Sequence, residues 1–108
     1  MGAKSAVINL ALELEGVIES PIFIGSRGAG EIIRNKMDTF FDEGVESITL
    51  EFLGVEEITQ SFGDEIIGIY VRAFGVNFVK SKIKLNNANQ SIKDTLNFVA
   101  SYSKVKTA

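Results

Sequence analysis

The chain has 108 residues, a length that fits one domain over 1–108, and its 11 basic and 14 acidic side chains give a net charge of −3. It has no cysteine and no histidine, which excludes thiol nucleophiles, disulfides, Cys/His zinc sites and histidine general bases. The acidic balance disfavours nucleic-acid binding, and no apolar run approaches the ~20 residues of a membrane span. We therefore expect a soluble domain whose partners are neither nucleic acids nor membranes.

The first half of the chain predicts two strands, a helix and a third strand. In residues 8–14 large apolar side chains alternate with smaller or polar ones, as in a half-buried strand. Residues 21–25, "PIFIG", predict a short second strand. The segment 26–44 predicts a loop feeding a helix with one apolar face, and Gly44 is its expected stop. Period-two alternation returns over 45–55 and predicts the third strand. The residues of that helical face are Ile33, Met37, Phe40 and Phe41.

The second half predicts a helix, a strand and a last helix. Apolar residues between 62 and 73 recur at helical spacing, and Gly75 is the expected end of that helix. Residues 77–87 alternate again and predict a fourth strand. Ser91 is positioned to cap a final helix. The apolar residues of these two helices are Phe62, Ile66, Ile69 or Tyr70, and Ala73 in the first, and Ile92, Leu96, Val99 and Tyr102 in the second.

The element order is β-β-α-β-α-β-α, which predicts an α/β fold with about four strands in a mixed sheet and three helices. Strands that are covered on both faces read as continuous apolar runs, whereas these strands alternate. We therefore expect the helices mainly on one face, with the other face open to solvent or to a second copy in a homodimer. The residues expected on that open face are Asn9, Glu13, Thr49, Glu51, Lys80, Lys82 and Lys84.

The segment "ITQSFGDEIIG", residues 58–68, is the first candidate functional site. Ser61 and Asp64 have the spacing of a helix cap, and two acids in a first turn complement the positive end of a helix dipole. The functional interpretation is a docking patch for a protein, formed by Ser61, Phe62, Asp64 and Glu65 with Arg27 nearby. Acid/base chemistry by the two carboxylates lacks a histidine, a metal motif or a second acidic pair to support it.

The segment "GSRGAGE", residues 25–31, is the second candidate. Glycines before a helix let backbone N–H groups face an anion, so Ser26, Arg27 and Gly28 could hold a phosphate or another small anionic ligand. The segment lacks the ending of a nucleotide-binding P-loop, and the simpler interpretation is a turn with Ser26 as the helix cap. Arg27 would pair with Asp64 or Glu65 if the two helix starts were neighbours.

Two further polar stretches have simpler interpretations. Lys80, Lys82 and Lys84 are expected on the outer face of a strand, where lysines guard against edge pairing. The asparagines in "NNANQS", residues 86–91, are typical of a turn followed by a helix cap.

The segments "LEFLGVEEITQSFGDE" and "NNANQSIKDTL" make residues 20–100 resemble the bacterial STAS-like domain of unknown function. That family has a strand ending near "DF.GV..I..SFADE", an arginine before the first helix and an asparagine before the last. The matching positions here are Arg27 and either Asn86 or Asn89. Gly63 stands where the family has alanine, which lowers helix propensity at that position.

The resemblance implies a non-enzymatic regulatory module without a cofactor in the bacterial cytoplasm. Members of the wider STAS superfamily include anti-sigma-factor antagonists, in which an ATPase-fold kinase phosphorylates a serine at a helix start. An anti-sigma factor or a histidine-kinase-like ATPase is therefore the implied partner. Aligned strand to strand, the switch serine falls on Gln60, which cannot be phosphorylated, so Ser61 and Thr59 are the neighbouring candidate phosphosites.

Overall fold

The computed structural model describes residues 4–107, with side chains up to Lys104. Three strands, β1 (Ser5–Asn9), β3 (Ser47–Glu51) and β5 (Ile83–Asn86), form a parallel sheet in the order β1-β3-β5. Two shorter strands, β2 (Phe23–Ile24) and β4 (Glu57–Ile58), pair separately and are also parallel. The α/β class is confirmed, although the strands divide into two small sheets.

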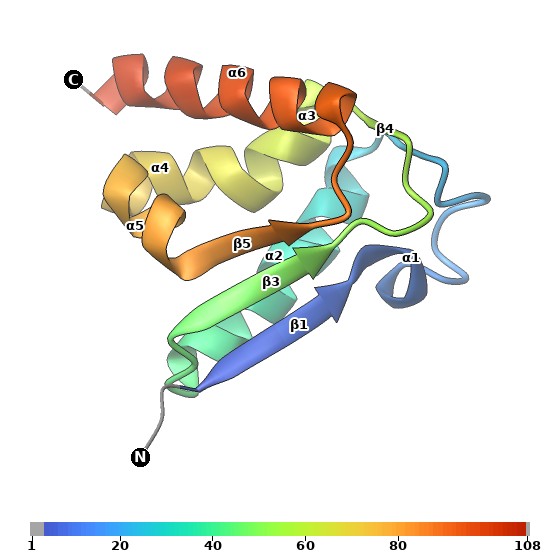
Figure 1. Cartoon of the computed structure of the whole chain (residues 1–108), viewed down its shortest axis with the longest axis horizontal. Helices are drawn as coiled ribbons and strands as arrows, with labels where there is room; N and C mark the ends of the chain where they lie inside the picture. Colours follow the sequence, from blue (N-terminus) through green and yellow to red (C-terminus); the bar gives the residue numbers. More distant parts are fainter. Residues whose placement is uncertain (1–3, 108) are drawn as a thin grey trace.

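The helices that cover the sheet share one face (Figure 1). The crossover from β1 to β3 contains α2 (Arg27–Asp42), and the crossover from β3 to β5 contains the helical segment 60–74 and α5 (Val76–Lys82). The strand order does not reverse, so right-handed crossovers place both sets of helices on the same side. The helix α6 (Gln90–Thr107) packs on segment 60–74.

Segment 60–74 is one continuous helix made of three parts. It begins as α3 (Gln60–Gly63), widens into the π-helical turn η1 (Asp64–Gly68) and ends as α4 (Ile69–Phe74). Phe62, Ile66 and Tyr70 all face the core, as the helical spacing predicted. A π turn holds one extra residue, so it rotates the following residues relative to a regular helix. This rotation matters for the ion pairs described below.

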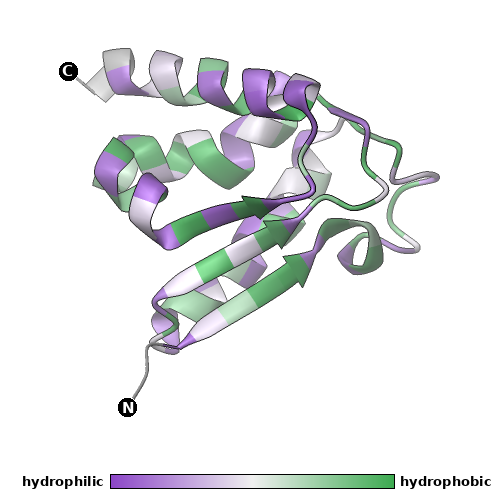
Figure 2. Ribbon diagram, viewed as in Figure 1, coloured by the Kyte–Doolittle hydropathy of each residue, from purple (hydrophilic) through white to green (hydrophobic). Residues whose placement is uncertain are grey.

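The core lies between the sheet and these helices. The inner sheet positions Ile8, Ile48 and Leu50 are fully buried, as are Ile33 and Met37 of α2. The outer positions Val7, Thr49 and Lys84 share one register row and are all at least partly exposed. The hydropathy-coloured ribbon shows this alternation along β3, whereas the middle of β1 is apolar throughout (Figure 2). The prediction of one covered and one open face is therefore confirmed for this sheet.

The expected strand over 8–14 is wrong beyond Asn9. There the chain turns into the short helix α1 (Leu10–Glu13), because the Asn9 side chain accepts a hydrogen bond from the Leu12 N–H at 3.1 Å. Leu10 and Leu14 are buried and Leu12 is exposed. A spacing of four residues places two leucines on one side of a helical turn, so the same residues fit both a strand and a helix.

The expected strand over 77–87 is also wrong in its first half, because α5 occupies Val76–Lys82. Gly75 has a φ of +95°, which ends α4 and redirects the chain without ending helical structure. Phe78 then packs its ring against Phe74 at a centroid distance of 4.7 Å. Lys80 and Lys82 consequently lie on a helix, and of the three lysines only Lys84 occupies a strand.

Two helix caps also differ from the expectation. Thr59 rather than Ser61 caps segment 60–74, and its hydroxyl oxygen accepts from the Phe62 N–H at 3.2 Å. Asn89 rather than Ser91 caps α6, and its side-chain oxygen accepts from the Ile92 N–H at 2.9 Å. The Ser26 cap of α2 and the stop at Gly44, with a φ of +91°, are confirmed.

Helix α2 approaches segment 60–74 closely at one glycine. A Cβ added to Gly30 would lie 2.6 Å from the Glu65 Cβ and 3.2 Å from the Phe62 carbonyl oxygen. A Cβ added to Gly28, two residues earlier in the same helix, would meet nothing within 4 Å. Only Gly30 therefore has a packing role in this contact.

We expect Gly30→Ala to lower the free energy of unfolding by about 1–3 kcal/mol, since the added methyl group forces the two helices apart. Gly28→Ala is the matched control, and it should be neutral or slightly stabilising because alanine is the better helix former. Urea unfolding of both variants measures the difference. Equal stability of the two variants would contradict the close approach.

Candidate functional site

The two helix starts that the sequence singled out are neighbours. The Thr59 hydroxyl donates a hydrogen bond to the Gly25 carbonyl oxygen at 2.7 Å, and β2 pairs with β4 just before the two helices begin. Arg27 at the start of α2 therefore lies beside Asp64 and Glu65. Its guanidinium is 3.2 Å from the Asp64 carboxylate and 2.8 Å from the Glu65 carboxylate. The predicted pairing is confirmed with both acids.

Two more arginines complete what we call the arginine–carboxylate cluster, formed by Arg27, Arg34, Arg72, Asp64 and Glu65. Arg34 of α2 pairs with Glu65. Arg72 of α4 binds both oxygens of Asp64, at 2.7 and 3.1 Å, and donates to the Ser103 hydroxyl of α6 at 2.9 Å. Each acid is thus held by two arginines, and the cluster links α2, segment 60–74 and α6.

Helix geometry explains why these side chains meet. Arg27 and Arg34 are seven residues apart, which is two turns, so both point from α2 towards segment 60–74. Asp64 and Arg72 are eight residues apart, and the extra residue of η1 brings them to the same side of their helix. A Cβ on Gly68 would lie 2.2 Å from an Asp64 carboxylate oxygen, so a glycine is needed between them.

The electrostatics of the cluster favour its charged forms. The hydrogen bond from Arg72, followed by that from Arg27, lowers the pKa of Asp64 below its ordinary value of 3.8 despite burial. The hydrogen bonds to Glu65 and Asp64 raise the pKa of Arg27. The hydrogen bond to Asp64 also raises the pKa of Arg72. Asp64 therefore stays ionised and paired, which does not suit it as a proton donor at neutral pH.

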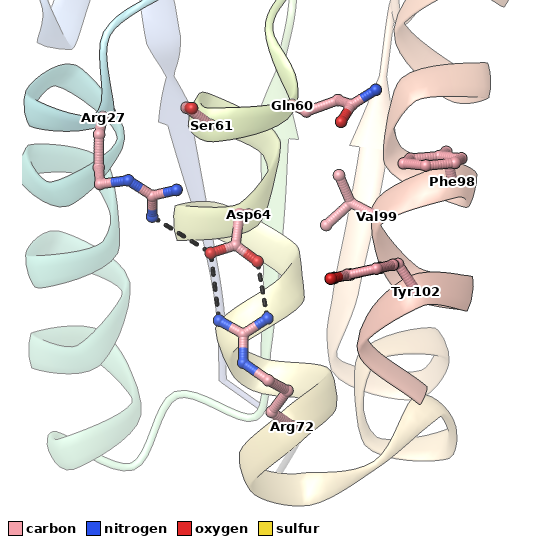
Figure 3. Close-up of a pocket in the computed structure, with 8 residues that line it drawn as sticks. All are labelled: Arg27, Gln60, Ser61, Asp64, Arg72, Phe98, Val99 and Tyr102. Carbon is pink, nitrogen blue, oxygen red and sulfur yellow. Dashed lines mark hydrogen bonds and ion pairs between the residues drawn. The ribbon is translucent and has the colours of Figure 1, made fainter. Parts of the chain in front are cut away.

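An open pocket of about 400 Å³ lies above the cluster, between α2 and α6 (Figure 3). Asp64 and Arg72 form its lower part, and the Gln60 amide extends towards α6 while the Ser61 hydroxyl lies on the α2 side. The rings of Phe98 and Tyr102 form the α6 wall. These rings stack at a centroid distance of 6.4 Å, and each residue is 54% exposed. The remaining lining residues are Arg27 and Val99.

The predicted docking residues do not share one environment. Phe62 is fully buried, so its apolar area stabilises the fold and is not available to a partner. Glu65 is 5% exposed and belongs to the cluster. Asp64 is partly exposed, whereas the side chain of Arg27 is 53% exposed. Together with Ser61, these last two define the part of the predicted patch that reaches the pocket.

The predicted anion-binding residues have other partners. The Ser26 hydroxyl oxygen accepts from the Ala29 N–H at 3.0 Å as a helix cap, and the Arg27 guanidinium is committed to two carboxylates. Gly28 is exposed at the start of α2. Across the described residues 4–107, the His, Cys, Asp and Glu side chains form no group of three or more that could hold a metal ion.

The asparagine turn joins the ends of β3 and β5. Glu51 accepts from Asn86 at 2.7 Å and from Asn87 at 2.9 Å, and the bond from Asn87 is the main reason that the pKa of Glu51 is lowered. Asn87 adopts a φ of +55°, and Asn89 also donates to the Glu56 carbonyl oxygen at 2.8 Å. The prediction of a turn followed by a cap is confirmed.

A family model described as the STAS-like domain of unknown function matches residues 29–93, which is more than half of the chain. The chain belongs to this family. The match includes segment 60–74 and the asparagine turn but not Arg27. No curated protein and no solved structure matches the chain. No helix in the described residues is long and apolar enough to cross a membrane.

Sequence reasoning missed Arg34, Arg72, Phe98 and Ser103. Arg34 could have been found from its two-turn spacing to Arg27 on a helix that was correctly predicted. Arg72 could not, because its position relative to Asp64 depends on a π turn that has no simple sequence signal. Phe98 lies outside the apolar face of α6, and an aromatic residue outside such a face is a sequence signal of an interaction surface.

We expect Asp64→Asn to lower the free energy of unfolding at pH 7 by about 1–3 kcal/mol, because charge-assisted hydrogen bonds from two arginines are lost. Since the pKa of Asp64 is lower in the folded protein, its stabilising effect is complete above pH 3.8 and declines as the pH falls through the folded-state pKa. The stability difference from wild type should therefore shrink in acid.

Urea unfolding of wild type and variant between pH 7 and about pH 2 measures this dependence. Asp94→Asn is the control, because Asp94 is an exposed residue whose carboxylate accepts from Gln90 on its own helix. A stability difference for Asp64→Asn that stays constant throughout the acid range would contradict the assignment.

Proposed function

We propose that this STAS-like domain is a non-enzymatic regulatory module that binds a protein partner at the pocket between α2 and α6. The observation that carries the proposal is the stacked pair Phe98 and Tyr102, two half-exposed rings beside a polar rim. Aromatic residues and arginine are enriched in protein interfaces, and a few such residues usually provide most of the binding energy. Arg27 supplies an exposed guanidinium on the opposite wall.

The chemistry of the pocket supports binding rather than catalysis. The chain has no histidine or cysteine, and the acid closest to the pocket is held by Arg27 and Arg72. A general base needs a pKa near the working pH, whereas the pKa of Asp64 is displaced downwards. The pocket is also open to solvent, which suits a protruding side chain of a partner better than a substrate that must be enclosed.

The family resemblance suggests the kind of partner and a location in the bacterial cytoplasm. An ATPase-fold kinase of the histidine-kinase type, or an anti-sigma factor, would bind the start of segment 60–74. The two candidate phosphosites, Ser61 and Thr59, differ in the hydrogen bonds of their hydroxyls. Thr59 uses its hydroxyl both as the helix cap and as the donor to Gly25. Within the described residues the Ser61 side chain makes no hydrogen bond, and it lies at the pocket.

The alternative function, binding of a nucleotide or small anion by the Gly25–Gly30 loop, has less support. An anion at Arg27 would compete with the Asp64 and Glu65 carboxylates for the same guanidinium. The nearby negative charge of these acids opposes the approach of a phosphate. A nucleotide-dependent thermal shift that disappears in Arg27→Ala would nevertheless favour this function over docking.

We expect Phe98→Ala to weaken partner binding by tenfold or more while the protein still unfolds cooperatively, because Phe98 is exposed and supplies apolar contact area. Phe74→Ala is the matched control. Phe74 is an aromatic residue with 62% exposure on α4, and it does not line this pocket. The partner is first captured with the wild-type chain and identified by mass spectrometry, and affinities are then measured by calorimetry with the purified partner.

The two variants distinguish the docking surface from a general loss of stability. If Phe98→Ala binds as tightly as wild type, or if Phe74→Ala loses binding equally, the partner does not use the pocket between α2 and α6.

A further inference from the structure

The charges of the chain are strongly segregated along its sequence. Residues 1–75 contain thirteen acidic and five basic side chains, whereas residues 76–108 contain six lysines and one acidic residue, Asp94. In the fold, the elements α5, β5 and α6 come from this basic part. They lie together in the cartoon, at the end of the colour scale (Figure 1). We call these three elements, which carry six of the chain's eight lysines, the basic side.

That basic side contains an apolar groove of about 190 Å³, which we call the basic groove. It lies between β5, whose only strand neighbour in the described sheet is β3, and α6. The volume of the groove accommodates a small aliphatic side chain, and Lys80 lines it. Most of the other lining residues are apolar and come from four elements: Ile67 and Val71, Val76 and Val79, Ile83 and Leu85, and Leu96 and Ala100.

Lysines of α5 and β5 lie beside this groove. The Lys84 ammonium group donates to the Lys80 carbonyl oxygen at 3.3 Å, so the Lys84 side chain turns back towards α5. Lys80 and Lys104 line the adjoining hollow with Val71. Within the described part of the chain, Lys80 and Lys84 form no ion pair. Their charges are available to an acidic partner.

A surface with the opposite charge lies on α1 and the loop that follows it. Leu12 and Leu53 are 66% and 64% exposed, and they line one hollow together with Glu15 and Glu19. Val17 is exposed on the loop between these two acids, where Gly16 turns the chain with a φ of +82°. We call these residues, Leu12, Glu15, Val17, Glu19 and Leu53, the acidic patch. Neither of its two acids forms an ion pair in the described structure.

We propose that the acidic patch of one copy docks into the basic groove of a second copy, in a head-to-tail contact. Figure 1 shows α1 and its loop at one end of the molecule and α5 at the other, so one copy cannot fill its own groove. The acidic patch has exposed apolar side chains and the basic groove has apolar walls, and the unpaired charges at the two surfaces have opposite sign. This complementarity fits a copy of the chain better than it fits an uncharged partner. A head-to-tail contact uses two different surfaces of each copy, both of which remain outside the pocket between α2 and α6.

Reciprocal charge reversal tests this contact. A groove variant, Lys80→Glu with Lys84→Glu, should self-associate at least tenfold more weakly than wild type, and so should a patch variant, Glu15→Lys with Glu19→Lys. An equimolar mixture of the two variants should associate again, because each groove then meets a patch of opposite charge. Sedimentation equilibrium between about 10 µM and 1 mM protein measures all three samples. Wild-type association should also weaken at high salt.

Lys4→Glu with Lys93→Glu is the charge-matched control, because both lysines are exposed and neither lines the groove. It should associate like wild type, and circular dichroism checks that every variant is folded. A wild-type chain that stays monomeric over the whole concentration range would overturn the proposal. A mixture of folded variants that associates no better than its components would also overturn it.

Discussion

The fold depends most on the pairing of Asp64 and Glu65 with three arginines. A buried carboxylate such as Glu65 costs several kcal/mol to remove from water unless charged hydrogen bonds compensate it, and here two arginines of α2 do so. Arg72 donates in the same way to the Asp64 carboxylate, and it also donates to the Ser103 hydroxyl on α6. Because the cluster joins α2 to segment 60–74 and Arg72 binds Ser103 of α6, its geometry sets how the three helices pack on one another. Gly30 and Gly68 provide the space that this geometry needs.

This constraint changes how the segment "SFGDE" is interpreted. Three of its five residues, Phe62, Gly63 and Glu65, are buried, and they hold the helix in place. The surface that a partner can reach is the start of the helix at Gln60 and Ser61. The Phe98 and Tyr102 rings face it across the pocket. The arginine–carboxylate cluster holds the floor of the pocket rigid beneath the exposed rings of Phe98 and Tyr102. Such a pocket suits binding, because few side chains need to be ordered when the partner binds.

The sequence predicted the α/β class, the covered face of the sheet, α2, most of segment 60–74 and the pairing of Arg27, since each depends on local periodicity or on neighbouring helix starts. It failed where one pattern fits two structures. Leu10, Leu12 and Leu14 satisfy both a strand and a turn of helix, and the Asn9 cap decides between them. Residues 76–82 are helical because Phe78 packs on the aromatic side chains of α2 and α4, a contact that no local pattern records. Arg72 was missed because its alignment with Asp64 depends on the π turn η1, which packs against α6 and has no simple sequence signal.

The acids of segment 60–74 act through their arginines within the fold. A double-mutant cycle tests this pairing most directly, with Asp64→Ala, Arg72→Ala and the double variant compared with wild type by urea unfolding at pH 7. If the pair acts as described, the two single losses are not additive, and the coupling free energy is about 1 kcal/mol or more. Additive losses, with a coupling free energy near zero, would contradict the account.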